Sequence, residues 1–383
     1  MTTKVLLFEP RFEGHHLPWT GMISHALLAE KYEVIFAHGS DPRQLVRLDE
    51  AFPGLCAQLE CVSVQTDGVF DGGSAFAALQ RLAERTSPDR ILVANLDEFA
   101  SRLFRGASVW GGHGQPLKGQ LRGIYHRPRP LDPAQGGFGN MIKRFGYRRL
   151  VRQGAFAGLG ILDEFLVEQS GGLSSTPPMT WMPDFWRPMH SVTRDESRAA
   201  MQVPNGSMGL LFFGVSHRRK GLDLAVAAME CCSDERAFLL LAGRQDHDPV
   251  LAARVARLVE NGKAVVHDRF LSEDEMSMAF TASDRVLLPY RSHYGSSNIL
   301  STAASVLRPV IASDFHLIGK RVVEHQLGVV HKDRDSLSLA KAIDRSLAAT
   351  SDEFSSWIDG MTAWAARTSP EAFSRSVLQL VHS

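Results

Sequence analysis

Residues 284–315 constrain the fold of this chain more than any other stretch. Two apolar runs, Val286 to Leu288 and Val310 to Ala312, flank a polar turn and a helix expected at about 299–306. The turn consists of small and polar residues: Gly295, Ser296, Ser297 and Asn298. Small residues before a helix let an anion reach unpaired backbone N–H groups, and the helix dipole favours negative charge there. The stretch predicts a phosphate-binding strand–turn–helix–strand unit; the alternative is an ordinary βαβ unit with a Gly/Ser loop.

Size and charge exclude several classes of protein. A chain of 383 residues, 44% of them hydrophobic, predicts two domains of about 150–200 residues each. Its 42 basic and 42 acidic residues do not favour a nucleic-acid binder. The four cysteines have no CxxC or zinc spacing, which indicates reduced thiols. No run approaches the roughly 18–20 apolar residues of a spanning helix, and the N-terminus is typical of a strand rather than a signal peptide, so we expect a cytoplasmic protein.

Apolar runs alternate with helix-period segments, which is the pattern of parallel α/β sheets. Strands are expected at 4–8, 33–37, 90–95, 123–126 and 163–167, and again at 208–213, 237–242 and 264–267. Residues 171–191, rich in Gly, Ser, Thr and Pro, interrupt the pattern and indicate a hinge. We therefore expect domains at 1–185 and 186–365, with the ligand in the cleft between them.

Five segments carry a resemblance to one family. They are 8–27, 212–229, 238–245, 265–290 and 291–312. In this order and spacing they resemble the motifs of GT-B glycosyltransferases, family 4 (glycosyltransferase group 1). The resemblance is weaker between 40 and 160. It implies two Rossmann-like domains facing each other across a cleft, with the C-terminal helix, 366–383, packing back on the first domain.

The same resemblance implies transfer of a sugar, of the hexosyltransferase type, from a nucleotide-diphosphate sugar to an acceptor hydroxyl. The transfer would be retaining and independent of metal or other cofactor, with the leaving phosphate accepting the proton. The acceptor would be a glycan, a lipid-linked molecule or a small molecule. Without a metal, cations and N–H dipoles must stabilise the charge that develops on the leaving diphosphate.

Two segments of the second half resemble the family's donor-diphosphate site. Lys220 matches the basic position, with Arg218 or Arg219 as a second cation, because Val215 stands where the family often has arginine. Backbone N–H groups of Gly295–Ile299 would hold the β-phosphate, helped by the side chains of Ser296, Ser297 and Asn298. The alternative for the three consecutive basic residues is a solvated loop.

The sequence departs from the family at two acidic positions. Typical members carry two glutamates separated by seven residues, one for the sugar and one for the ribose; Tyr294 and Thr302 occupy these places. Their hydroxyls can bond a sugar or ribose hydroxyl, but less strongly than a carboxylate, and His293 is a neighbouring alternative. The departure brings the donor's identity and catalytic competence into question.

Other site residues follow more loosely from the resemblance. Gly14 and His16 would line the cleft after the first strand, and His126 stands near the family's donor-contacting catalytic histidine. A lone histidine is more often structural. Asp97 is interpreted as a helix cap, the alternative being a residue that orients the acceptor hydroxyl. Arg269 with Phe270 falls in the base-binding loop, where Phe270 is either a core residue or a platform.

Two charged segments have simpler interpretations. Asp246, His247 and Asp248 spell an Asp-x-Asp, interpreted as a loop and helix cap, and no metal site is expected. Residues 141–152 predict a basic amphipathic helix, which would contact the inner membrane face; the alternatives are a solvated helix face and one that binds an anionic acceptor.

Three other functions stay open. A sugar-nucleotide epimerase on this scaffold would need acidic groups in the cleft. A catalytically weakened GT-B protein would bind a nucleotide or partner another transferase. A nicotinamide oxidoreductase is disfavoured, because no GxGxxG follows the first strand.

Overall fold

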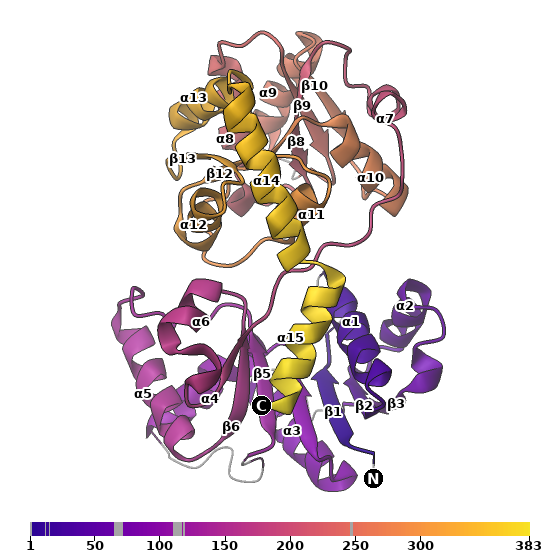
Figure 1. Ribbon diagram of the computed structural model, residues 1–383, viewed down its shortest axis with the longest axis vertical. Coiled ribbons are helices and arrows are strands. Elements are labelled where there is room, and N and C mark those ends of the chain that lie inside the picture. Colours follow the sequence, from indigo (N-terminus) through magenta and orange to yellow (C-terminus); the bar gives the residue numbers. More distant parts are fainter. Residues whose placement is uncertain are drawn as a thin grey trace. The chain divides into compact units, whose positions relative to one another are not determined.

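The computed structural model describes residues 2–383 except 12, 15, 65–71, 110–116, 118 and 246–247. The chain divides into two compact units (Figure 1). The first comprises Met1–Pro183 with Pro370–Ser383, and the second Asp184–Ser369. The division thus falls at 183/184, where the sequence placed it at 185, and the C-terminal segment that joins the first unit begins at Pro370 rather than 366.

The first unit is built on a parallel sheet. Among the described residues it has seven strands, in the order β3-β2-β1-β4-β5-β6-β7. The strands are β1 (Lys4–Glu9), β2 (Glu33–His38), β3 (Glu60–Ser63), β4 (Arg90–Val93), β5 (Leu121–Tyr125), β6 (Phe156–Ile161) and β7 (Met179–Trp181). The helices are α1 (His16–Ala29), α2 (Arg43–Ala51), α3 (Gly72–Thr86), α4 (Asp97–Val109), α5 (Phe138–Arg152), α6 (Glu164–Ser170) and α15 (Pro370–His382), with the 3₁₀ turns η1 (Cys56–Gln58) and η3 (Gly172–Ser174).

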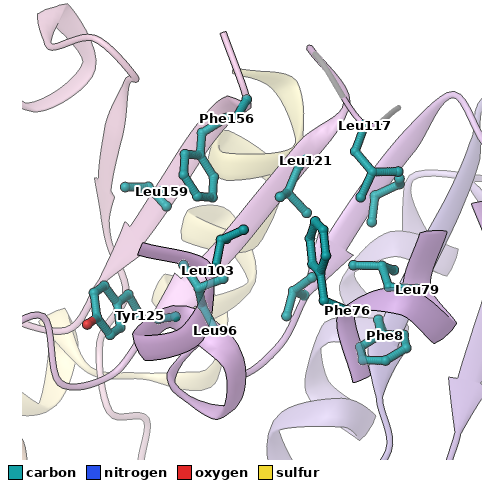
Figure 2. Packing of buried hydrophobic residues seen from close by; sticks show 14 of the residues in the cluster. Phe8, Phe76, Leu79, Leu96, Leu103, Leu117, Leu121, Tyr125, Phe156 and Leu159 are labelled. Atoms are coloured by element: carbon teal, nitrogen blue, oxygen red, sulfur yellow. The ribbon is translucent and has the colours of Figure 1, made fainter. Parts of the chain in front are cut away.

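Apolar side chains from strands and helices form the core on one face of this sheet. Figure 2 shows Phe8 of β1 and Tyr125 of β5 beside side chains from α3 and α4, such as Phe76 and Leu103. On α1, the ring of Trp19 lies edge-on to Phe373 of α15, with 4.8 Å between centroids. The last helix of the chain is therefore part of the first unit.

The second unit repeats the plan. Its described parallel strands lie in the order β10-β9-β8-β11-β12-β13. They are β8 (Met208–Phe213), β9 (Ala237–Ala242), β10 (Ala264–His267), β11 (Arg285–Leu288), β12 (Val310–Ser313) and β13 (Gly328–His331). The helices are α7 (Arg194–Ala200), α8 (Leu222–Cys231), α9 (Pro249–Glu260), α10 (Glu273–Ala282), α11 (Asn298–Ser305), α12 (His316–Glu324), α13 (Ser336–Leu347) and α14 (Ser351–Arg367), with the 3₁₀ turn η4 (Arg218–Lys220).

The strand order explains where a ligand can bind. A continuous apolar run such as β9 is buried along its whole length, as expected for a strand covered on both faces. Both sheets have the doubly wound strand order. In such a sheet, the connections that follow two adjacent central strands run toward opposite edges of the sheet, and the place between these strands is the switch point. That switch point lies between β1 and β4 in the first unit and between β8 and β11 in the second. Loops at the carboxyl ends of these strands are therefore the places to look for a site.

Several sequence-based expectations were wrong in detail. Residues 163–167 were expected as a strand, but Asp163 caps α6 by accepting a hydrogen bond from the backbone N–H of Leu166. The strand lies earlier, as β6. The short strands β3 and β7 were not expected, and β7 lies inside the 171–191 segment.

Candidate functional site

Two loops of the second unit meet at the switch point. The loop after β8 ends in η4 and Gly221, and the loop after β11 begins at Pro289. Gly221 has φ +75°, and a Cβ there would run into the Pro289 carbonyl oxygen. Arg291 donates its backbone N–H to the Arg219 carbonyl at 2.8 Å. The two loops are thus fixed against each other by backbone contacts that only glycine permits at position 221.

Lys220 is the buried cation of this pair of loops. Its Nζ donates to the Phe213 carbonyl oxygen at 3.0 Å and lies 5.9 Å from the centre of the Tyr290 ring. Burial, and secondly the charge of Arg219, lower the pKa of Lys220 to about 8. A desolvated ammonium of this kind gains stability from a nearby anion.

A second link between the loops runs through a histidine. His293 Nε2 donates to the Ser296 carbonyl oxygen at 2.9 Å, so its Nδ1 accepts from Arg219 Nη1 at 2.5 Å. The exposed Arg219 is thereby held toward the turn before α11, whereas Arg218 is exposed on η4. Of the three predicted cations, Arg219 is linked to this turn through His293, and Lys220 lies over the ring of Tyr290.

The turn before α11 leaves the helix N-terminus without a side-chain cap. Ser297 is the N-cap residue, but its side chain makes no capping hydrogen bond and instead lies 3.3 Å from the Tyr290 hydroxyl. By contrast, Ser272 and Thr350 cap α10 and α14 in full capping boxes. Uncapped first-turn N–H groups are the donors that an anion uses at a helix N-terminus.

A buried polar cluster supports this turn, and sequence reasoning missed it. Arg321 of α12, 1% exposed, donates to the Ser296 hydroxyl. Its guanidinium also lies 5.0 Å from the centre of the Trp364 ring of α14. Asp184 is buried beside them: burial raises its carboxyl pKa, and the Ser296 hydrogen bond and the Arg321 charge act in the opposite direction. The one signal in the sequence was that Arg321 stands at helical spacing from the apolar residues Leu317 and Ile318.

The residues at the two glutamate positions are buried. Tyr294 is 5% exposed, and its ring lies 4.2 Å from that of His316, centroid to centroid. Thr302 is 4% exposed and donates from Oγ1 to the Asn298 side-chain oxygen at 3.3 Å. Asn298 in turn donates to the Phe185 carbonyl oxygen. The Thr302 hydroxyl is therefore hydrogen-bonded to a residue of its own helix, α11.

In the predicted base-binding loop, the side chain of Arg269 is ion-paired and that of Phe270 is exposed. Both terminal nitrogens of Arg269 lie 2.5 Å from the Glu275 carboxylate, and this pairing lowers the pKa of Glu275 to about 2. Phe270 is 71% exposed, with the Arg244 guanidinium 6.0 Å from its ring centre. Phe270 is therefore a surface residue and not part of the core.

In the first unit, the predicted residues lie at the carboxyl ends of β1, β4 and β5. Gly14 has φ +62°, and His16 Nδ1 donates to the buried Glu9 carboxylate at 2.9 Å. His126 Nε2 donates to the Ala94 carbonyl oxygen at 3.1 Å, and its ring lies 4.7 Å from that of Trp19.

Asp97 was interpreted as a helix cap, and the structure gives it another role. It is the first residue of α4, and its carboxylate accepts the backbone N–H groups of His126 at 2.7 Å and Arg127 at 3.0 Å. Asp97 therefore fixes the loop after β5, including the backbone of His126.

Metal and membrane-spanning features were searched in the part of the chain that the structure describes. There, no group of three or more His, Cys, Asp or Glu side chains is placed to hold a metal ion. Asp246 and His247 lie outside the described residues, while Asp248 caps α9. No described helix has the length and apolar character needed to span a bilayer.

Comparisons with known proteins were made for the sequence and for the fold. Residues 208–349 match the family described as Glycosyl transferases group 1. No curated protein sequence matches the chain. Sucrose-phosphate synthase from Thermosynechococcus elongatus is similar in structure, with TM-score 0.69 and 15% identity over 99% of this chain and 98% of that one.

Two other solved structures are similar over nearly the whole chain. WaaG, described as a glycosyltransferase involved in lipopolysaccharide biosynthesis, has TM-score 0.65 and 14% identity over 98% of this chain and 99% of that one. HepE from Anabaena, in complex with UDP and glucose, has TM-score 0.68 and 14% identity over 99% of each chain. At these identities the likenesses establish the fold.

Proposed function

We propose that this chain transfers a sugar from a nucleotide-diphosphate sugar to an acceptor hydroxyl, because residues 208–349 match the family described as Glycosyl transferases group 1 and the chain has the GT-B fold. The transfer is proposed to retain the configuration of the sugar and to need no metal. The acceptor is a glycan, a lipid-linked molecule or a small molecule.

One observation carries this proposal. The ammonium of Lys220 and the uncapped N-terminus of α11 are both close to Tyr290, whose ring lies 5.9 Å from Lys220 Nζ and whose hydroxyl lies 3.3 Å from the Ser297 hydroxyl. A diphosphate placed here would meet a positive charge and a row of backbone N–H groups together. Both features stabilise the negative charge that develops as the nucleotide leaves.

The remaining residues have supporting roles in the proposed mechanism. Arg219, held by His293, supplies a second positive charge toward the leaving diphosphate. Ser296 and Asn298 fix the turn, the first through Arg321 and the second through the Phe185 carbonyl. The acceptor hydroxyl attacks from the face that the diphosphate leaves, and the departing phosphate oxygen takes its proton. His126 is proposed to contact the donor.

A titration of nucleotides into the protein tests the site. Calorimetry with UDP, GDP, dTDP and ADP should detect one preferred nucleotide, and UDP is tried first because HepE was solved with UDP and UDP-glucose. Lys220→Ala should weaken that binding at least tenfold, since the diphosphate loses its buried cation.

The matched control is Lys263→Ala, because the Lys263 Nζ also donates to a backbone carbonyl, that of Glu235 at 2.8 Å, but in an exposed position. This variant should bind like wild type. Absence of binding to all four nucleotides would refute the diphosphate site, and equal weakening by both substitutions would show that Lys220 has no specific part in it.

A second function is favoured by Tyr294 and Thr302. Because no carboxylate stands at either position, the chain could bind the nucleotide sugar without turning it over. Release of free nucleotide from the bound sugar donor, followed with and without candidate acceptors, separates the two functions. Tight binding without release would favour the binding protein.

A further inference from the structure

Positive charge is concentrated in one part of the first unit. Residues 99–162 contain eleven basic residues and one acidic residue, a formal charge of +10 by subtraction, in a chain whose formal net charge is zero. This stretch runs from α4 through β5 and α5 to β6. An overall neutral chain with so uneven a distribution has a strongly positive local field.

Helix α5 presents an exposed stripe that is apolar toward its N-terminal end and basic toward its C-terminal end. Phe138, Met141, Phe145, Arg148 and Arg152 follow each other at helical spacing and are all exposed; we call them the α5 face. The three apolar members are 72%, 58% and 57% exposed, respectively. The opposite side of the helix, with Tyr147 and Leu150, is buried in the core. The outer stripe of α5 therefore leaves more than half of each of these large apolar side chains exposed.

The surroundings of the α5 face are basic as well. Arg102 and Arg105 are exposed on α4, which packs against α5, and Arg127 and Arg129 are exposed in the loop after β5. Burial lowers the pKa of Lys143 on α5, and the charges of Arg105 and Arg129 lower it further. Charges from three elements therefore act on one region.

Helix α5, which carries the α5 face, is held to the preceding loop by hydrogen bonds. Arg144 donates to the carbonyl oxygens of Pro130, Asp132 and Gln135 at 2.8–3.2 Å, which ties the start of α5 to the loop before it. The apolar side chains are thus displayed on a fixed helix.

We propose that the α5 face docks on an anionic lipid bilayer, lying in the interface with Phe138, Met141 and Phe145 inserted and the arginines on the lipid phosphates. An amphipathic helix of this kind binds by buried apolar area together with attraction to anionic headgroups. The surface complements such a bilayer in both respects. A nucleic acid would use the charge but would leave the methionine and phenylalanine stripe without a partner at its outer end.

Sedimentation with vesicles tests the proposal. The full chain is mixed with vesicles of phosphatidylcholine alone and of phosphatidylcholine with 30% phosphatidylglycerol (on the order of the anionic content that gives a strong surface potential). It should sediment with the anionic vesicles, and less so as salt increases. Arg148→Glu with Arg152→Glu should weaken this at least tenfold, since each arginine near such a surface is worth roughly fivefold. Phe138→Ser with Phe145→Ser should weaken it comparably.

Helix α9 supplies the matched control, because it exposes an apolar and a basic residue too. Val250 is 73% exposed and Arg257 is exposed on the same helix. Val250→Ser with Arg257→Glu should leave vesicle binding unchanged. The unfolding midpoint of each variant is first compared with that of the wild type. A double variant with a lower midpoint is replaced by the single Phe145→Ser or Arg148→Glu variant.

Three outcomes would overturn the proposal. They are absence of binding to anionic vesicles, binding unchanged by both sets of α5 substitutions, and binding of a single-stranded RNA homopolymer in place of vesicles at the same salt.

Discussion

The guanidinium of Arg321 donates a hydrogen bond to the hydroxyl of Ser296, 25 residues earlier in the chain. The contact joins α12 to the turn before α11. Because Arg321 is buried and its guanidinium faces Trp364, this bond holds the turn from inside the unit. The shape of the proposed diphosphate site therefore depends on a residue outside it.

Coupling between these two residues can be measured with a double-mutant cycle. Ser296→Ala should lower the free energy of unfolding by about 1–2 kcal/mol, because it leaves the buried guanidinium short of one acceptor. Arg321→Met should lower it by about 2–4 kcal/mol, since it removes the charge that faces Asp184. The double variant should lose less than the sum, by about 1–2 kcal/mol.

Urea unfolding of the four proteins gives this coupling. Lys320→Ala, at an exposed neighbour of Arg321, serves as the control and should stay within about 0.5 kcal/mol of wild type. Strict additivity of the two substitutions would show that the bond does not contribute in solution.

The low pKa of Lys220 makes nucleotide binding depend on pH. Burial and the charge of Arg219 bring this pKa to about 8 from its ordinary 10.5, and a bound diphosphate should raise it again. Above pH 8, binding must therefore be accompanied by uptake of a proton, and affinity for the preferred nucleotide should fall as pH increases. Calorimetry in buffers of different ionisation enthalpy at pH 8.5 measures the uptake, which Lys220→Ala should abolish.

The low pKa of Lys220 also affects the stability of the unliganded protein. Between pH 8 and 10.5 the unfolded chain binds more protons at position 220 than the folded one, so this residue makes the free energy of unfolding increase with pH across that window. The difference in unfolding free energy between wild type and Lys220→Met should shift in favour of wild type from pH 7.5 to 9.5. An unchanged difference would argue against a desolvated ammonium.

Gly221 should tolerate no side chain. Its φ of +75° strains any L-residue, and a Cβ would also meet the Pro289 carbonyl oxygen. Gly221→Ala should thus destabilise the protein by about 3 kcal/mol, from backbone strain and the displaced loop together. Gly206 has a similar φ of +82° with nothing within 4 Å of its Cβ position, so Gly206→Ala should cost about 1 kcal/mol. Thermal unfolding of both variants separates the clash from the strain.

The sequence predicted the two parallel-sheet units well because continuous apolar runs and helical periodicity are local signals. Strand β9 and the β11–α11–β12 unit are examples, and the resemblance to GT-B glycosyltransferases identified the fold. Short elements at sheet edges were harder. Strand β7 has three residues and follows Pro177 and Pro178, so composition indicated a loop.

Interactions between distant residues could not be predicted in the same way. Asp184, Ser296 and Arg321 come from three segments without a common motif, so their cluster required the fold. For Phe270, the apolar side chain favoured core and platform equally, and only the exposure of the loop distinguishes them. Asp163 had the signature of an N-cap, but the apolar residues after it were taken as a strand.

We expect the position of the backbone at His126 to depend on the Asp97 carboxylate. Its carboxylate accepts two N–H groups, those of His126 and Arg127, from a loop 29 and 30 residues away in the chain. Asp97→Ala leaves both donors without this acceptor, and it should lower the free energy of unfolding by about 2 kcal/mol. Asp97→Asn retains one good acceptor oxygen and should lose about half of that.

Two measurements check this prediction. Urea unfolding gives the loss of stability, with Asp89→Ala as the control: Asp89 accepts the single exposed N–H of Lys4 at 2.8 Å, so its replacement should cost under about 1 kcal/mol. The imidazole proton resonances of His126 give the local effect, because the ring is held between the Ala94 carbonyl and Trp19. They should shift in Asp97→Ala and stay in place in Asp89→Ala. A stable Asp97→Ala protein with unshifted resonances would mean that the loop after β5 keeps its position through other contacts.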